Sequence, residues 1–130
     1  ARREPTWRSR GRIKLGRIDM KGKVILLNSE YIGQGDETLG FEILMTLLNS
    51  LQKRNDKPEA IILWNTAVKL MTAESPASGP LRELELAGVN ILGGMLCLKD
   101  LCIVDAVVVG KAVTMDDILD LLLHNEVISL

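Results

Sequence analysis

The chain has few residues that could bind metal or form disulfides, with two cysteines and one histidine among 130 residues. Two cysteines are too few for a disulfide scaffold, and Cys97 and Cys102, five positions apart in a helical segment, would lie too far apart to pair. One histidine and two cysteines match none of the recurring zinc-ligand spacings. We therefore expect two free thiols, no metal site and no cofactor.

Long apolar segments are also missing. No uncharged stretch approaches the roughly 18 to 20 residues needed to cross a bilayer, and the N-terminus is polar and basic, unlike a secretory signal. A length of 130 residues with 47% hydrophobic and 25% charged side chains is typical of one domain with a modest core. We expect a cytoplasmic protein that does not bind membranes.

Charge is distributed unevenly along the chain. Residues 1–22 carry eight basic and two acidic side chains, a net charge of +6, and residues 23–130 carry eight basic and fifteen acidic ones, a net charge of −7. An acidic body lacks the clustered Lys and Arg that bind phosphate backbones, so we expect no nucleic-acid partner. We interpret 1–22 as a flexible basic extension or expression-derived sequence, with an edge strand at 12–18 as an alternative.

From residue 23 onward, short apolar runs alternate with helical periodicity. Strands are predicted at 24–27, 60–64, 89–92, 106–109 and 127–130, and helices at 36–54, 67–74, 79–87 and from Thr114 or Asp116 to 123. Runs that are apolar throughout are typical of parallel strands buried on both faces. The pattern predicts one α/β domain over 23–130, a flavodoxin-like three-layer α/β/α sandwich with a mostly parallel five-stranded sheet.

Two other features are interpreted structurally. The loop at 28–35 leads from a strand into a helix, a place where amides can bind anions, but it lacks nucleotide-binding spacings and carries Glu30, Asp36 and Glu37 nearby. Ordinary turn geometry is the better interpretation, with Asp36 as the N-cap of the next helix. His124 ends the last predicted helix, where the dipole stabilises a cation, so we expect it to cap that helix.

Cys97 is the strongest candidate for chemistry, because it follows the apolar run 89–96 and reactive groups of open α/β sheets gather beyond the carboxyl ends of strands. Gly93 and Gly94 would open the backbone after the strand, and a helix from Leu98 would stabilise a thiolate. Cys102 is interpreted as a small buried hydrophobe. Residues after neighbouring strands and before Cys97 are candidate substrate-binding neighbours: Asn28, Ser29, Asn65, Thr66, Gly93 and Gly94.

The globular part also resembles a known family through the order and spacing of many residues. They are Val24 to Asn28, Gly33, Gly35, Asp36, Glu37, Leu39, Gly40, Asn65, Val68, Lys69, Leu70, Ser75, Pro76, Leu81, Leu84, Gly88, Val89, Ile91, Leu92, Cys97, Leu98, Val109, Gly110 and Met115. On these residues, 23–130 resembles the DsrE/DsrF-like sulfur-relay proteins, particularly the DsrE-like domain of YedF-type selenium-metabolism proteins.

This resemblance implies a carrier of sulfur or selenium, sulfurtransferase-like, that passes a persulfide on Cys97 between partner proteins. It also implies a homo-oligomer, a trimer or hexamer, and a relay partner such as a TusA-like protein. Where YedF-like proteins have Cys-Gly-Thr-Cys, this chain has Gly94, Met95, Leu96 and Cys97, so one thiol would act alone. The rival interpretation is a non-catalytic oligomeric assembly or small-ligand-binding module with the same fold and a buried Cys97.

Overall fold

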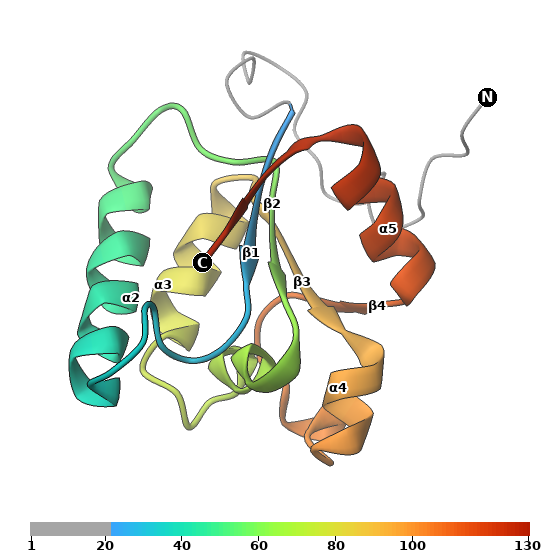
Figure 1. Ribbon diagram of the computed structural model, residues 1–130, viewed down its shortest axis with the longest axis horizontal. Helices are drawn as coiled ribbons and strands as arrows, with labels where there is room; N and C mark the ends of the chain where they lie inside the picture. The colour runs from blue at the N-terminus through green and yellow to red at the C-terminus, as the bar shows by residue number, and fades with distance from the viewer. Residues whose placement is uncertain (1–21) are drawn as a thin grey trace.

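The computed structural model describes residues 22–130, so most of the basic extension and the alternative edge strand at 12–18 lie outside the described residues. The described chain builds a five-stranded sheet in the order β4-β3-β2-β1-β5 (Figure 1). Its strands are β1 (Lys23–Leu27), β2 (Ala60–Leu63), β3 (Asn90–Gly94), β4 (Lys111–Val113) and β5 (Glu126–Ser129). All four pairings are parallel, which confirms the predicted α/β class.

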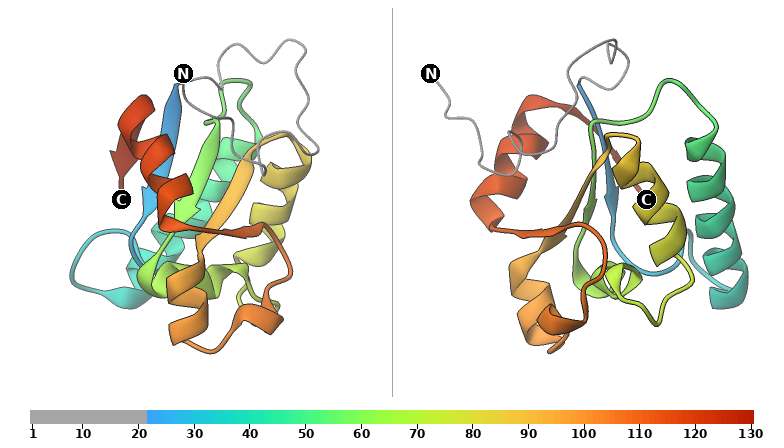
Figure 2. Two further views of the ribbon diagram at one scale, coloured as in Figure 1. Left: turned by 90° about the vertical axis from the view of Figure 1, so that its right-hand side faces the viewer. Right: turned by 180° about the vertical axis from the view of Figure 1, so that it is seen from behind.

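Helices cover both faces of the sheet. Helices α2 (Glu37–Gln52) and α3 (Ser78–Leu86) lie on one face and α5 (Met115–His124) on the other (Figures 1 and 2). The chain steps from β1 through β2 to β3 in one direction across the sheet, then returns from β4 at one edge to β5 at the other. Because crossovers between parallel strands are right-handed, the reversed step places α5 on the opposite face.

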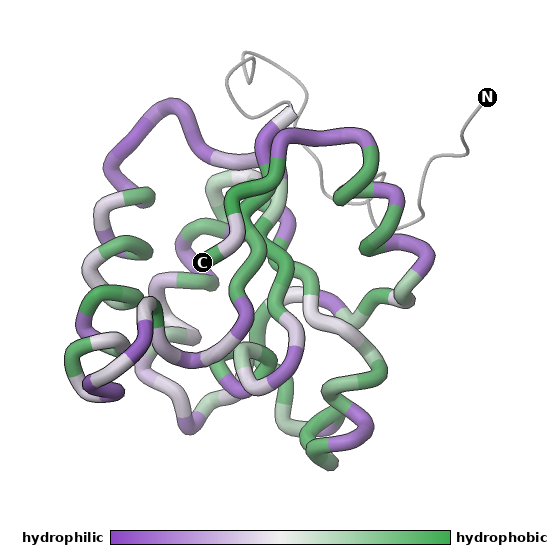
Figure 3. Tube along the Cα trace, in the orientation of Figure 1, coloured by the Kyte–Doolittle hydropathy of each residue, from purple (hydrophilic) through white to green (hydrophobic). Residues whose placement is uncertain are grey.

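The core is divided between these two faces. Side chains of a strand point alternately to either side, so Ile25 and Leu27 of β1 pack with α2 and α3, whereas Val24 and Leu26 pack with Ile118 of α5. Burial on both sides explains why β2 and the part of β1 after Lys23 are apolar throughout, as the hydrophobic stretches at the centre of Figure 3 show.

Three residues lie at helix ends as predicted: Asp36, Thr114 and His124. The Asp36 carboxylate accepts a hydrogen bond of 2.9 Å from the amide of Leu39 and caps α2. Thr114 caps α5 in a reciprocal arrangement with Asp117, which decides between the two predicted starts. His124 ends α5, and its Nδ1 lies 2.8 Å from the carbonyl oxygen of Asp120. These short-range signals suffice because each depends on residues within one helical turn.

The fourth predicted strand, at 106–109, is wrong, because the strand is Lys111–Val113. The apolar run was misleading, since Val109 is buried against the α2 and α3 face and Val107 forms only an isolated bridge with Thr72. Residues Val104–Ala106 form a short 3-10 helix, η3. Gly110, with a φ of 82°, then turns the chain into β4.

The predicted boundary before Cys97 is also wrong. Strand β3 continues through Gly93 and Gly94, which pair with Ala112 and Val113 of β4, so these glycines do not open a loop. Helix α4 (Met95–Asp100) begins directly after them instead of at Leu98. Cys97 therefore lies in the first turn of α4. The predicted helix at 67–74 is the 3-10 helix η2 (Asn65–Met71), which follows β2 after one residue.

Candidate functional site

The carboxyl ends of three neighbouring strands form a surface pocket of about 440 Å³. Trp64 and Asn65 come from the segment after β2, Gly94 to Cys97 from the end of β3 and the start of α4, and Val113 from β4. Helix α4 lies beyond the end of β3, and α5 starts beside it after β4 (Figure 1). This end of the sheet is where open α/β folds place their ligands.

The Cys97 thiol is held by a specific contact in the wall of this pocket. Its Sγ accepts a hydrogen bond from the backbone amide of Asn65, with the nitrogen and sulfur 3.0 Å apart. The residue is half-buried, so part of it faces solvent. A hydrogen bond donated to sulfur stabilises negative charge there, because a charged acceptor binds a donor more strongly than a neutral one. The contact gives the sulfur a fixed hydrogen-bond donor at the pocket wall.

Two backbone features bring the thiol and the amide together. Side chains in a helix tilt toward its N-terminus, which brings Sγ of Cys97 close to Gly94, where an added Cβ would lie 3.7 Å from the sulfur. Asn65 has a φ of 53°, in the left-handed region that asparagine tolerates better than most residues. This conformation sets the direction of its amide.

The pocket wall beside Asn65 is anchored to the carboxyl ends of β1 and β5. The indole Nε1 of Trp64 donates a hydrogen bond of 2.7 Å to Oδ1 of Asn28, which follows β1. The Nδ2 of Asn28 in turn donates to Oγ of Ser129 at 2.9 Å and to the carbonyl oxygen of Leu130 at 2.8 Å. One amide side chain therefore connects the ends of β1, β2 and β5.

The structure brings together only some of the predicted site residues. Asn65 and Gly94 line the pocket with Cys97. Gly93 does not line the pocket, and an added Cβ there would sit 2.4 Å from Sδ of Met71, so that side chain would have to move. Asn28 contributes indirectly, through Trp64.

The remaining two predicted neighbours have other surroundings. Ser29 closes a local turn, in which its hydroxyl donates to the carbonyl oxygen of Tyr31 at 2.8 Å and accepts from the amide of Tyr31 at 3.1 Å. Thr66 is the second residue of η2 and is absent from the pocket lining.

Sequence reasoning missed most of the pocket lining, which is largely apolar. The missed residues are Trp64, Met95, Leu96, Asp100, Leu101, Val113, Met115 and Ile118. Trp64 could have been found, because it directly precedes the polar pair that ends the second predicted strand. Met115 and Ile118 carry no such signal, since α5 reaches the pocket only through the crossover from β4.

Cys102 is not the buried residue that was predicted. Its side chain is exposed, and its φ of 59° lies in the left-handed region. The amide of Ile103 donates to the carbonyl oxygen of Leu98, and the amide of Cys102 to that of Lys99, both at 3.0 Å. This pair of bonds is the Schellman arrangement that ends helices, and it places Cys102 where glycine is usual. Both cysteines are free thiols.

The loop at 28–35 is an acidic turn. The negative charges of Glu30 and Glu37 raise the pKa of Tyr31 above its ordinary value. The amide of Ile32 donates to the carbonyl oxygen of Gly40 at 3.1 Å and so folds the loop back onto α2. A negative potential opposes an anionic ligand, in agreement with the interpretation of this segment as ordinary turn geometry.

Residues 22–130 contain no clustered metal ligands and no membrane-spanning helix. No group of three or more His, Cys, Asp or Glu side chains in this part of the chain is arranged to hold a metal ion. No helix within the same residues is both long and apolar enough to span a membrane.

Comparisons with known proteins identify the fold. MTH1491 from Methanobacterium thermoautotrophicum, a protein of unknown function, superimposes with a TM-score of 0.62 and 15% identity over 83% of this chain and 97% of its own. The ychN protein from E. coli superimposes with a TM-score of 0.61 and 17% identity, over 85% of this chain and 100% of its own. The chain has the fold of these proteins. BT1422 from Bacteroides thetaiotaomicron, also of unknown function, superimposes with a TM-score of 0.63 and 17% identity, over 87% of this chain and 98% of its own. No protein-family model and no curated protein sequence matches the chain.

Proposed function

We propose that this protein is a sulfur or selenium carrier that holds a persulfide on Cys97 and passes it between partner proteins. The observation that carries the proposal is the 3.0 Å hydrogen bond from the Asn65 amide to Sγ of Cys97, made in the wall of a surface pocket. A cysteine that only fills core space needs no access to solvent, whereas Cys97 is half-buried at the pocket. The resemblance of 23–130 to the DsrE/DsrF-like proteins supports the same chemistry.

The transfer requires one thiol and no change in net oxidation state. The Cys97 thiolate attacks the outer sulfur of a donor persulfide, R–S–SH, and forms Cys97–S–SH as the donor S–S bond breaks and R–S⁻ leaves. An acceptor thiolate, R′–S⁻, then attacks the same outer sulfur, which yields R′–S–SH and returns Cys97 to the thiolate. Each step consumes one thiolate and releases one, so a second cysteine is not needed. Selenium in the outer position follows the same balance.

The Asn65 amide supports both steps. It stabilises Cys97 as attacking thiolate in the first step and as leaving thiolate in the second. We further propose that the carrier works in the cytoplasm as a homo-oligomer, a trimer or hexamer. A separate relay chain, such as a TusA-like protein, would exchange sulfur with it.

The test uses a chain with one reporting thiol. Cys102→Ala protein is incubated with an inorganic polysulfide, separated from excess reagent and analysed by intact mass and peptide mapping. We expect a gain of one sulfur atom at Cys97, which a thiol acceptor removes. The matched control is Cys97→Ser in the same Cys102→Ala background, which has no thiol and should gain no sulfur. A folded Cys102→Ala variant that gains no sulfur would exclude the carrier function.

A second candidate is a ligand-binding module without chemistry, favoured by the largely apolar lining of a pocket whose volume is about 440 Å³. This volume falls within the range of about 300–1,000 Å³ for small-molecule sites. Under this alternative, Cys97→Ser would preserve binding of an apolar dye such as anilinonaphthalene sulfonate, and polysulfide would leave no sulfur at Cys97 of the Cys102→Ala protein.

A further inference from the structure

We propose that the sulfur partner of Cys97 is a protein segment in which apolar side chains adjoin the reacting cysteine and basic side chains lie farther out. The proposal rests on the carrier function above and specifies which side chains the partner presents around its reacting cysteine. It comes from three properties of the surface around the thiol: the composition of the pocket, the apolar stripe that leaves it, and the charges beside that stripe.

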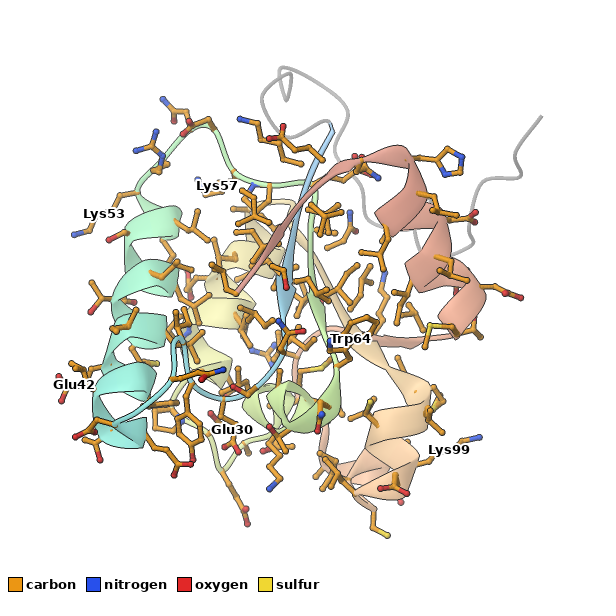
Figure 4. The ribbon with its side chains drawn as sticks, viewed as in Figure 1. Glu30, Glu42, Lys53, Lys57, Trp64 and Lys99 are labelled. Atoms are coloured by element: carbon orange, nitrogen blue, oxygen red, sulfur yellow. The ribbon has the colours of Figure 1, made fainter. Side chains whose placement is uncertain are left out.

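The pocket is apolar close to the sulfur. Among its lining residues, only Asn65 and Asp100 have polar side chains besides Cys97 itself, and the others are hydrophobic or glycine. The neighbouring cation, Lys99, projects from the outer side of α4 (Figure 4) and does not line the pocket. A group entering the pocket therefore meets apolar walls and one carboxylate, which disfavours an anion.

The apolar surface extends well beyond the pocket, which favours a protein over a small molecule. Leu96 and Met115 at the pocket are 72% and 50% exposed, respectively. Leu119 and Leu123 continue from Met115 at intervals of four residues along α5 and are 43% and 74% exposed. Residues four apart lie on one helix face, so Met115, Leu119 and Leu123 form a stripe that leads away from the thiol. Exposed apolar surface of this extent marks an interaction site.

Acidic side chains run beside this stripe. Asp116 and Asp120 directly follow Met115 and Leu119 in the sequence and are themselves four residues apart, so they share one side of α5 next to the stripe. With Asp100 at the pocket, they give the edge of this surface a negative charge. Basic residues flanking the apolar part of a partner would complement these carboxylates, and acidic ones would be repelled.

The test measures disulfide exchange with short peptides. Peptides carry a central cysteine as its mixed disulfide with 2-thiopyridine, flanked on both sides by leucine, serine, glutamate or lysine. The Cys97 thiolate of the Cys102→Ala protein attacks the peptide sulfur, the S–S bond breaks, and 2-thiopyridone leaves and is measured by absorbance. Each rate is divided by that of free 2-mercaptoethanol with the same peptide, which removes differences in intrinsic reactivity.

We expect the leucine peptide to react about ten-fold faster than the serine peptide. Burial of one or two apolar side chains supplies a free energy equivalent to that rate difference. The lysine peptide should exceed the glutamate peptide. Leu96→Ser with Leu123→Ser should remove the leucine preference, and Asp100→Asn with Asp120→Asn should reduce the lysine preference. All four positions are exposed or half-buried, so the substitutions should leave the fold intact.

Three results would overturn the proposal. Normalised rates that are equal for all four peptides would show that the surface does not select a partner. Acceleration of benzyl 2-pyridyl disulfide without acceleration of the leucine peptide would identify a small molecule as the occupant. Dissociation of an oligomer by Leu119→Ser and Leu123→Ser, with unchanged peptide preference, would assign the stripe to a second copy of this chain. Because exchange does not require a stored persulfide, failure here is distinguishable from failure of the carrier function.

Discussion

The backbone amide of Asn65 donates a hydrogen bond to Sγ of Cys97 at 3.0 Å, across 32 positions of sequence. The two residues follow neighbouring parallel strands, β2 and β3, whose carboxyl ends lie side by side. The contact depends on an unusual backbone conformation at Asn65, with a φ of 53°, and on the start of α4 directly after β3. This hydrogen bond connects the fold to the proposed chemistry. It can be tested by substitutions that change the backbone conformation of Asn65.

Two substitutions of Asn65 should distinguish the contribution of its backbone amide from that of its side chain. Asn65→Gly retains the amide and the positive φ, so the rate of Cys97 alkylation in a Cys102→Ala background should stay within about two-fold. Asn65→Val disfavours that φ by about 1–2 kcal/mol and should turn the amide away from sulfur. A hydrogen bond to a charged group contributes about 1.5–3 kcal/mol, only part of which appears in reactivity, so we expect alkylation to slow about ten-fold.

Iodoacetamide kinetics at neutral pH would measure both rates. Circular dichroism would confirm that each variant is folded. Equal rates for a folded Asn65→Val protein and the parent would show that the amide does not activate the thiol.

Asn28 should matter for stability more than its exposed position suggests. Asn28→Ala removes the acceptor for Trp64 Nε1 and the donor to Ser129 and Leu130, and we expect a loss of about 1–2 kcal/mol. The control is Ser29→Ala, which removes contacts confined to one turn and should cost less than about 1 kcal/mol. Urea denaturation measures both free energies of unfolding, and equal losses would contradict the anchoring role of Asn28.

Two glycines with the same backbone conformation should respond differently to alanine. Gly33 and Gly110 have φ values of 85° and 82°, so each Ala variant pays about 1–2 kcal/mol for the left-handed conformation. A Cβ at Gly33 meets open space, whereas one at Gly110 would lie 2.6 Å from the carbonyl oxygen of Ile91. Gly110→Ala should therefore lose a further ~1–3 kcal/mol, measured by the same denaturation experiment. Matching losses would show that β3 can shift to accept the methyl group.

Cys102→Gly should stabilise the protein. Cysteine at a φ of 59° costs about 1–2 kcal/mol, and glycine removes that cost while adding unfolded-state entropy, which leaves a net gain of about 0.5–1 kcal/mol. Lys99→Gly, inside α4, should instead destabilise by about 1 kcal/mol. Thermal denaturation under reducing conditions would measure both effects. A loss of stability in Cys102→Gly would indicate that the exposed thiol contributes a favourable contact.

Prediction from sequence succeeded where one segment's own pattern is sufficient. The strand at Ala60–Leu63 and the helix at Glu37–Gln52 follow from apolar runs and periodicity, and Asp36 and Thr114 mark helix starts through contacts within one turn. The strand Lys111–Val113 was missed because it is short, lies at the sheet edge and has one buried residue. An apolar run nearby, at 107–109, packs on the core without joining the sheet.

The sequence by itself determined the alternation of strands and helices and placed Cys97 beyond a buried strand, because the period of apolar residues and the helix caps are local properties. Only the tertiary structure decided what surrounds the thiol. The amide of Asn65 reaches Cys97 through parallel pairing of β2 with β3. Met115 and Ile118 reach the same pocket because α5 crosses the opposite face of the sheet. These relations depend on strand order and crossover handedness, which act between segments far apart in the chain.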